Sequence, residues 1–407
     1  MSCRLLSRRT RWVLALTALG GACLPKAFGV YEPERFGDPS RRWAISVRTG
    51  GGYDDNPDTV STNKQGSFVA GGAIVTQANL PLGQTFLRGR YQYQVSYTEN
   101  RVGDELDESH SLDALLSHTF SPRLVLDLTD SARRGIEPEL VEIQGGQPIE
   151  LRRRGDYVFN SAGANLSYQL SRRWTASVRG NWELWRYDVD DVAFVNDRDS
   201  YLGNVECVYA LSPRTYTGVG YQYLINEYDN PGSNDVRNST AHIGYVTFSH
   251  TFNPRLSTAA NVGAEFREFG DGTEDTAPSV SASLNYSFAR DALATLGVYY
   301  SIALTEVGTF RSSDTTTIFA RANYRLTQKL RVSVDGLYSL SSFRNPVPGT
   351  VNLGDSEEAY RAGVTLSYDF TRLVSGFFNY NYDKADSDVS GRSFDRNRVG
   401  VGLNLLY

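Results

Sequence analysis

Four histidines are the side chains in this sequence best suited to acid–base chemistry near neutral pH. Two of them open nearly identical segments, HTFSPRL at His118 and HTFNPRL at His250, while His110 and His242 stand apart from these segments. Neither of the latter has a serine–histidine–aspartate setting, and the sequence has no Gly-rich phosphate loop or metal-ligand spacing. We therefore expect no catalytic residue, cofactor or metal ligand, with hydrolysis by an unrecognised site as the alternative.

Two acidic stretches, DELDE (104–108) and DVDDVAFVNDRD (188–199), are candidates for divalent cations, because clustered carboxylates suit hard metal ions. Neither stretch has the Asp/Asn/Gly spacing of a dedicated calcium loop. Ordinary solvated loop charge is the alternative, and it is the interpretation that we favour.

The histidine segments belong to a larger family of repeated turns. Each copy has an aromatic residue or His, one further residue, then Phe or Leu, a polar turn and a new apolar run. The copies are centred on Phe120, Leu170, Leu211, Phe252, Phe288, Leu326 and Phe370. A polar turn between two alternating runs predicts a hairpin, so the chain is expected to be a series of hairpins.

Long runs of strict alternation flank these turns. In LRGRYQYQVSY (87–97) every apolar or small residue falls on one face and every polar residue on the other. Such runs match tilted membrane-spanning strands of about 9–11 residues better than the shorter strands of soluble proteins. The predicted strands are 43–53, 66–78, 85–98, 108–120, 124–136, 155–170, 174–188, 198–211, 215–228, 238–252, 256–268, 277–288, 293–306, 314–326, 330–342, 357–370, 374–384 and 395–407.

The first 29 residues read as a secretory signal, because Arg4, Arg8, Arg9 and Arg11 precede an apolar run at 12–24. We assign 1–29 to the signal, 30–42 to a short periplasmic segment and 43–407 to the folded part. The predicted mature chain keeps 36 basic and 46 acidic residues, which argues against nucleic acid as a partner. Only Cys207 remains in it, so no intramolecular disulfide is expected.

Short turns alternate with longer polar loops, and both ends of the folded part lie on the short-turn side. This asymmetry predicts an all-β fold, a single antiparallel up-and-down transmembrane barrel of about eighteen strands with periplasmic turns and extracellular loops. Sixteen strands are the alternative, because the phase of the Gly-rich region 54–84 is ambiguous. A secreted soluble β-propeller is the other alternative, since blades repeat at similar intervals.

The last strand adds a resemblance to this pattern. One face of it carries apolar residues and ends in a terminal aromatic: Val399, Val401, Leu403, Leu405 and Tyr407. This resembles the assembly signal of Gram-negative outer-membrane barrels, which usually end in Phe. The resemblance implies an outer-membrane location, contact with lipid and lipopolysaccharide, and recognition by the barrel-assembly machinery. GGYDDNPD (51–58) is also similar to a segment of barrels encoded with exopolysaccharide systems.

An eighteen-stranded barrel is wide enough for an aqueous channel, and the alternation predicts which charges line it. Arginines concentrate in the last strands and the first ones, and most acidic residues in the middle. We hypothesise a basic wall facing a more acidic wall, with ordinary solvated lining charge as the alternative. The basic set is Arg48, Arg88, Arg90, Arg321, Arg325, Arg331, Arg361 and Arg398; the other is Asp113, Asp127, Glu183, Glu206 and Glu265, with Arg133, Arg179 and Arg267.

Five aromatic residues fall on the predicted inner face: Trp185, Tyr216, Tyr299, Phe319 and Phe377. They could stack on sugar rings along a saccharide path, or pack against a loop folded into the lumen, for which 135–152 is the candidate. The sequence thus predicts a channel for small polar or anionic solutes or saccharides, with exopolysaccharide export as an alternative. A continuous apolar outer face favours a monomer.

Overall fold

The computed structural model describes residues 41–101, 105–136, 156–229, 235–305, 307–347, 349 and 354–407. Two short helices, α2 (Asp190–Asn196) and η2 (Asp235–Arg237), lie among eighteen strands. The strands are β1 (Trp43–Asp54), β2 (Ser67–Leu82), β3 (Thr85–Thr98), β4 (Leu106–Ser121), β5 (Leu124–Ile136), β6 (Asp156–Gln169), β7 (Trp174–Tyr187), β8 (Arg198–Ser212), β9 (Thr215–Tyr228), β10 (Ser239–Asn253), β11 (Leu256–Phe269), β12 (Glu274–Ala289), β13 (Ala292–Leu304), β14 (Phe310–Arg325), β15 (Leu330–Pro346), β16 (Ser356–Asp369), β17 (Val374–Ser387) and β18 (Phe394–Leu406).

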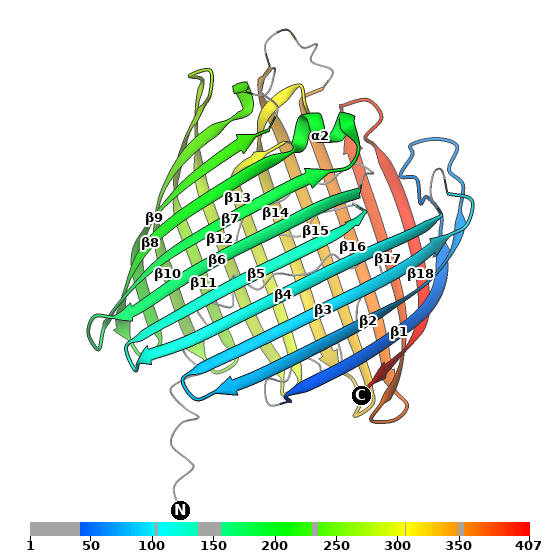
Figure 1. The fold of residues 1–407 in the computed structure, drawn as a ribbon, viewed down its shortest axis with the longest axis horizontal. Coiled ribbons are helices and arrows are strands. Elements are labelled where there is room, and N and C mark those ends of the chain that lie inside the picture. Colours follow the sequence, from blue (N-terminus) through cyan, green and yellow to red (C-terminus); the bar gives the residue numbers. More distant parts are fainter. Residues whose placement is uncertain are drawn as a thin grey trace, which may run out of the picture.

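All eighteen strands belong to one antiparallel sheet in which each strand pairs with its neighbours in sequence, and β1 pairs with β18 to close it. The strands tilt around the resulting barrel, and the C-terminus lies at the end opposite α2 (Figure 1). The predicted barrel of eighteen strands is therefore confirmed, and the sixteen-stranded and propeller alternatives are wrong. None of the described helices is long and apolar enough to span a membrane.

Alternate residues of each strand face opposite sides of the wall, as the period-two pattern requires. On β18, Val401 and Leu403 are about half exposed on the outer face, whereas the neighbouring Asn404 is 1% exposed on the inner face. The turn repeat supplies the lower aromatic belt: His118 contacts Phe120, and His250 contacts Phe252, at ring-centroid distances of 4.4 and 4.6 Å. These histidines thus lie among lipid-facing aromatics at the short-turn end.

The closing seam between β1 and β18 is built on glycine pairs. Gly50 lies opposite Gly402, and Gly52 opposite Gly400. A Cβ added to Gly50 or Gly402 would clash with the backbone oxygen of the facing strand. The glycines therefore allow the two strands to approach, and the Phe377 ring covers the surface that they leave bare on the inner face.

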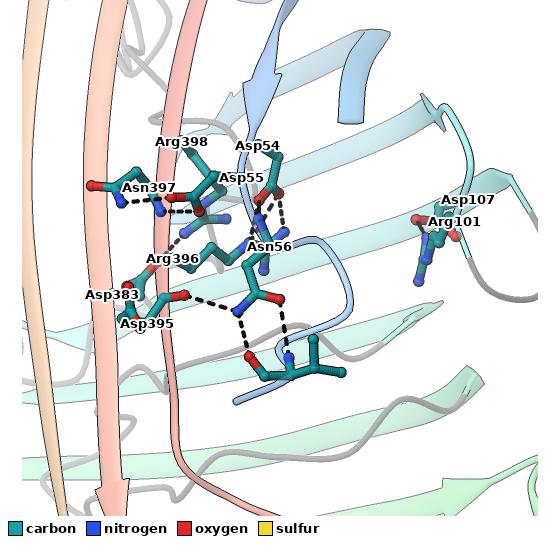
Figure 2. Close-up of polar contacts among 11 residues, drawn as sticks. Asp54, Asp55, Asn56, Arg101, Asp107, Asp383, Asp395, Arg396, Asn397 and Arg398 are labelled. Carbon is teal, nitrogen blue, oxygen red and sulfur yellow. Dashed lines mark hydrogen bonds and ion pairs between the residues drawn. The ribbon is translucent and has the colours of Figure 1, made fainter. Parts of the chain in front are cut away.

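Polar contacts at the extracellular end of the seam fasten β1 to β18 (Figure 2). The Arg396 guanidinium donates through Nε to both oxygens of Asp54, at 2.9 Å each, and both residues are buried. Asn397 donates its backbone N–H and its side-chain amide to the Asp55 carboxylate, at 2.6 and 2.7 Å. The buried Asn56 donates to the backbone oxygen of Asp395. The GGYDDNPD segment is thus part of the closure of the barrel.

Glycine at the seam gives a direct test of closure. Gly402→Val places a side chain against the Thr49 oxygen and the Phe377 ring, so we expect it to reduce strongly the fraction of protein that folds. The readout is the heat-modifiable band on unboiled gels, which only a closed barrel gives. Gly203→Val is the matched control, because Gly203 faces open space on β8. Equal folded fractions for the two variants would contradict this account of the seam.

Candidate functional site

Several of the arginines predicted to line the pore have defined contacts in the structure. On the strands that flank the seam, Arg48 lies 5.9 Å from the ring centroid of Phe377, and Arg88 donates from Nε to Asn79 Oδ1 at 3.2 Å. The side chains of Arg90 and Asp113 approach to 4.0 Å. Arg321 lies opposite Asp335 in the register of β14 and β15. The structure therefore places these arginines along one stretch of wall.

Several of these arginines have carboxylate partners that the sequence reasoning missed. Asp383 on β17 binds both neighbours, Arg361 on β16 at 2.8 Å and Arg398 on β18. Arg331 pairs with Asp369 at 2.7 Å. The missed carboxylates occupy inward positions of the same alternation, so the face pattern alone could have found them.

The acidic residues on the far side of the barrel are held mainly by neutral donors. Ser117 donates to Asp127 at 2.6 Å, and the Asn181 amide donates to Glu183 at 3.0 Å. Tyr245, an inward aromatic that the sequence reasoning missed, donates to Glu206 at 3.0 Å. An exception is Glu265, which is fully buried and pairs with Arg267 at 2.6 Å.

The ion pairs described above join one strand to the next, or join residues of one strand. This holds for Arg90 with Asp113, Arg331 with Asp369, and both arginines of Asp383. Side chains paired in this way lie along the wall. Together with the width of an eighteen-stranded barrel, this arrangement suits a water-filled lumen lined by polar groups.

The inward aromatics pack closely against the wall. Phe319 stacks on Tyr299 at 5.6 Å between centroids and covers Gly297, much as Phe377 covers Gly402. Trp185 packs against Phe159 at 4.5 Å, and Arg198 lies over its ring at 5.4 Å. Tyr216, on the inward face of β9, lies opposite Ala210 and Ser249. These contacts are thus with neighbouring strands of the wall, and packing against the predicted loop falls outside the described residues.

Helix α2 narrows the extracellular mouth. The helix follows β7, stands at the upper rim in Figure 1, and buries Val192 against Tyr157, Phe159 and Tyr187 on the inner face of β6 and β7. It lies within the acidic stretch 188–199, which is therefore a folded part of the mouth. The candidate for an infolded loop, 135–152, lies outside the described residues after Ile136.

Arg237 ties α2 to another segment of the mouth. Its side chain is 1% exposed and donates to the backbone oxygen of Val195, at 2.6 Å, and to that of Thr305. The guanidinium also lies 4.5 Å from the ring centroid of Tyr228. One buried charge thus links three connections of the barrel, those after β7, β9 and β13.

The extracellular end of the β13–β14 hairpin lies closer to the lumen than the neighbouring strands do. Residues Ser301–Ala303 are all buried, and the Ile302 oxygen accepts from Arg267 at 3.5 Å, although Arg267 lies on the inner face of β11. The pairing of β12 with β13 stops at Tyr300. A Cβ added at Gly308 would lie 3.2 Å from the Val195 side chain. The hairpin end and α2 therefore meet across part of the mouth.

Asp197, the residue that follows α2, bonds to the end of β7. The backbone N–H of Tyr187 donates to Asp197 Oδ1 at 2.8 Å. Burial raises the pKa of the Asp197 carboxyl above its usual range, against this hydrogen bond and the charge of Arg186, which favour the ionised form.

The histidines face lipid and bond to hydroxyl groups. His110 lies 2.8 Å from the Tyr91 hydroxyl, and His242 lies 2.6 Å from that of Tyr221. Across the described residues, no three His, Cys, Asp or Glu side chains form a group that could hold a metal ion. The arrangement has the features of a lining and a constriction, which are those of a channel.

Comparisons with known proteins identify a family for this chain. A family model described as "Putative beta-barrel porin 2" matches residues 194–407. Among solved structures, the chain is similar to OccAB4 of Acinetobacter baumannii, with 12% identity and a TM-score of 0.47, over 90% of this chain and 98% of that one. It is also similar to OccK2 (OpdF) of Pseudomonas aeruginosa, with 12% identity and a TM-score of 0.48, over 89% and 97%. No curated protein matches the sequence.

The contacts of Arg237 predict that its removal loosens α2 and the β13–β14 end at the mouth. In Arg237→Ala, α2 and the β13–β14 end lose their shared donor, and hydrogen bonds from a charged group are worth about 1.5–3 kcal/mol each. We expect faster hydrogen exchange at 190–196 and larger, noisier single-channel currents. The exposed turn arginine Arg255, replaced by Ala, is the control. Unchanged exchange at 190–196 in Arg237→Ala would mean that Arg237 does not hold α2.

Proposed function

The chain belongs to the beta-barrel porin 2 family and resides in the outer membrane of a Gram-negative bacterium, and on that premise we propose that it is a channel for small polar solutes. The observation that carries the proposal is the lining: charged side chains are paired along the wall, strand to strand, on the inner face of a barrel wide enough for water. Hydrolytic activity has no comparable support, because the histidines face lipid.

We extend the proposal to charge preference. The arginines near the seam and the acidic residues of the middle strands would set up a transverse field, which orients polar solutes and favours anions near the basic side. The carboxylates Asp383 and Asp369 weaken this field locally. Arg48, which lies over the Phe377 ring, and Arg88, which donates to the Asn79 amide oxygen, belong to the same basic side.

Saccharides are the second solute class that we propose, because aromatic side chains lie on the inner face. Phe319 and Phe377 lie on the inner face and cover glycines of the wall, although Phe377 is only 8% exposed. Exopolysaccharide export would need a wide path through the mouth, and α2 with the β13–β14 end narrows it. We therefore favour uptake of small solutes over export.

The location in the outer membrane suggests which partners the barrel has. The outer ends of several strands carry lipid-facing acidic residues such as Glu108 and Glu358, which suit divalent cations that bridge lipopolysaccharide. The terminal strand, with Val399, Val401, Leu403, Leu405 and Tyr407 on its outer face, is proposed to be read by the barrel-assembly machinery. One chain closes a complete barrel, so passage of a solute needs no second subunit.

Charge preference is tested by reversal potentials in planar bilayers under a potassium chloride gradient. Replacing Arg331 and Arg361 together by Gln should shift the reversal potential toward cation preference. A loss of about 0.5 kcal/mol, typical of a hydrated charge interaction, changes the permeability ratio by about twofold. The control replaces the exposed turn residues Arg214 and Arg255. A parent channel without preference, unaltered in the double variant, would rule out the transverse field.

A saccharide path is tested by current blockade with oligosaccharides. Phe319→Ala and Phe377→Ala should each weaken the blockade, because each removes a ring from the lumen wall. The matched controls are Ile318→Ala and Phe378→Ala, whose side chains are exposed on the lipid face. Absence of blockade in the parent protein would remove saccharides from the proposed solutes and would leave the channel itself in place.

A further inference from the structure

The lipid face of β5 carries a carboxylate near its middle. Asp130 shares this face with Leu126 and Leu128, and Leu128 is 39% exposed. In the register, Asp130 lies opposite Ala114 on β4 and Ala162 on β6. Asp130 therefore points away from the lumen, in a place where the alternation calls for an apolar residue.

The depth of Asp130 follows from the same register. On β5, Leu126 lies opposite His118, which belongs to the lower aromatic belt. Arg134 lies opposite His110, whose ring contacts Tyr91 and Tyr93 nearer the extracellular ends of these strands. Asp130 is four residues from Leu126 and four from Arg134. It thus lies near the centre of the apolar band, where a charged side chain is costly and marks a functional position by default.

One neighbour accompanies Asp130 on this surface. The Asn160 amide on β6 donates to Asp130 Oδ1 at 3.3 Å, and Val158 and Leu166 on the same face of β6 are exposed. Within the described ranges this is the hydrogen bond that the Asp130 carboxylate receives. Other lipid-facing charges, such as Glu108, Arg186 and Asp199, lie toward the extracellular ends of their strands, within reach of water.

The surface around the pair is recessed. Small side chains occupy the lipid face beside it, at Ala114, Ala132, Ala162, Ala164 and Gly180. Gly180 has open space where a Cβ would stand, and it lies opposite Gly203, which is equally open. A partner surface can therefore approach the backbone closely, as small residues allow in membranes.

The chemistry of the pair identifies the kind of partner. Acyl chains offer no hydrogen-bond donor at this depth, so a lipid cannot satisfy the carboxylate, whereas a protein surface can. Asp130 supplies acceptor oxygens and Asn160 supplies donor hydrogens side by side. Such a pair is self-complementary: a twofold axis along the membrane normal brings the same depth of a second copy into contact.

We propose that the lipid-facing surface of β4–β7 around Asp130 and Asn160 is the docking surface for a second copy of this chain. Asn160 of each barrel donates to Asp130 of the other, and the alanines and glycines let the walls meet. Each barrel keeps its own lumen, so the proposal is independent of the solute. It departs from the expectation of a monomer, which rested on an unbroken apolar outer face.

Cross-linking of the full-length protein reconstituted in lipid vesicles tests the proposal. Cys207, which lies on the lipid face of β8, is first replaced by Ser. A short bis-maleimide should then link Ala162→Cys into dimers. The matched control is Ala320→Cys, on the lipid face of β14, which should stay monomeric. Equal dimer yields from the two positions would overturn the proposal.

A second variant tests whether the polar pair, and not chance proximity of two barrels, produces the cross-link. Asp130→Leu, added to Ala162→Cys, should lower the dimer association constant by about tenfold, equivalent to about 1.4 kcal/mol, which fits two hydrogen bonds in a membrane. The heat-modifiable band confirms that this variant folds, and Asp130→Asn replaces it if it does not. An unchanged dimer yield would contradict the proposal. So would a cross-link from position 162 to another protein in whole outer membranes with none between pure copies.

Discussion

The structure depends on one requirement of the bilayer, that every backbone N–H and C=O of a spanning segment find a partner within the protein. A sheet meets this requirement only when its first and last strands pair, so the β1–β18 seam completes the barrel. Glycines at 50, 52, 400 and 402 let the strands approach, and the Asp54–Arg396 pair fixes their outer end. Breaking one side of such a buried pair typically costs about 3–5 kcal/mol.

Closure makes the two faces of the wall into two different environments. The outer face meets lipid, and its most polar point away from the ends is the pair Asp130 and Asn160. The inner face is polar, and its charges are balanced locally, as where Asp383 holds Arg361 and Arg398. The lumen is narrowed at its extracellular mouth, where Arg237 joins α2 to the β13–β14 end. In the channel that we propose, the wall provides the polar surface along which a solute passes, and the mouth limits the size of that solute.

Period-two alternation was enough to predict the strands and their number, because these depend only on local sequence. The contacts of Arg237 were not predictable, since they join connections far apart in the chain and depend on how the mouth folds. The packing of Phe319 and Phe377 on glycines was missed because it requires the register between strands. Asp130 breaks the alternation and was visible in the sequence as a polar residue at an apolar position.

The proposed function depends on a continuous aqueous path through the lumen of the closed barrel. Single cysteines along β7, in a Cys207→Ser background, test it most directly with a water-soluble, lipid-impermeant thiol reagent. The account predicts that cysteines at the inward positions Ser177 and Asn181 react rapidly, and that cysteines at the outward positions Val178 and Gly180 do not. Equally slow labelling at all four positions would contradict it, because it would mean that water does not fill the lumen.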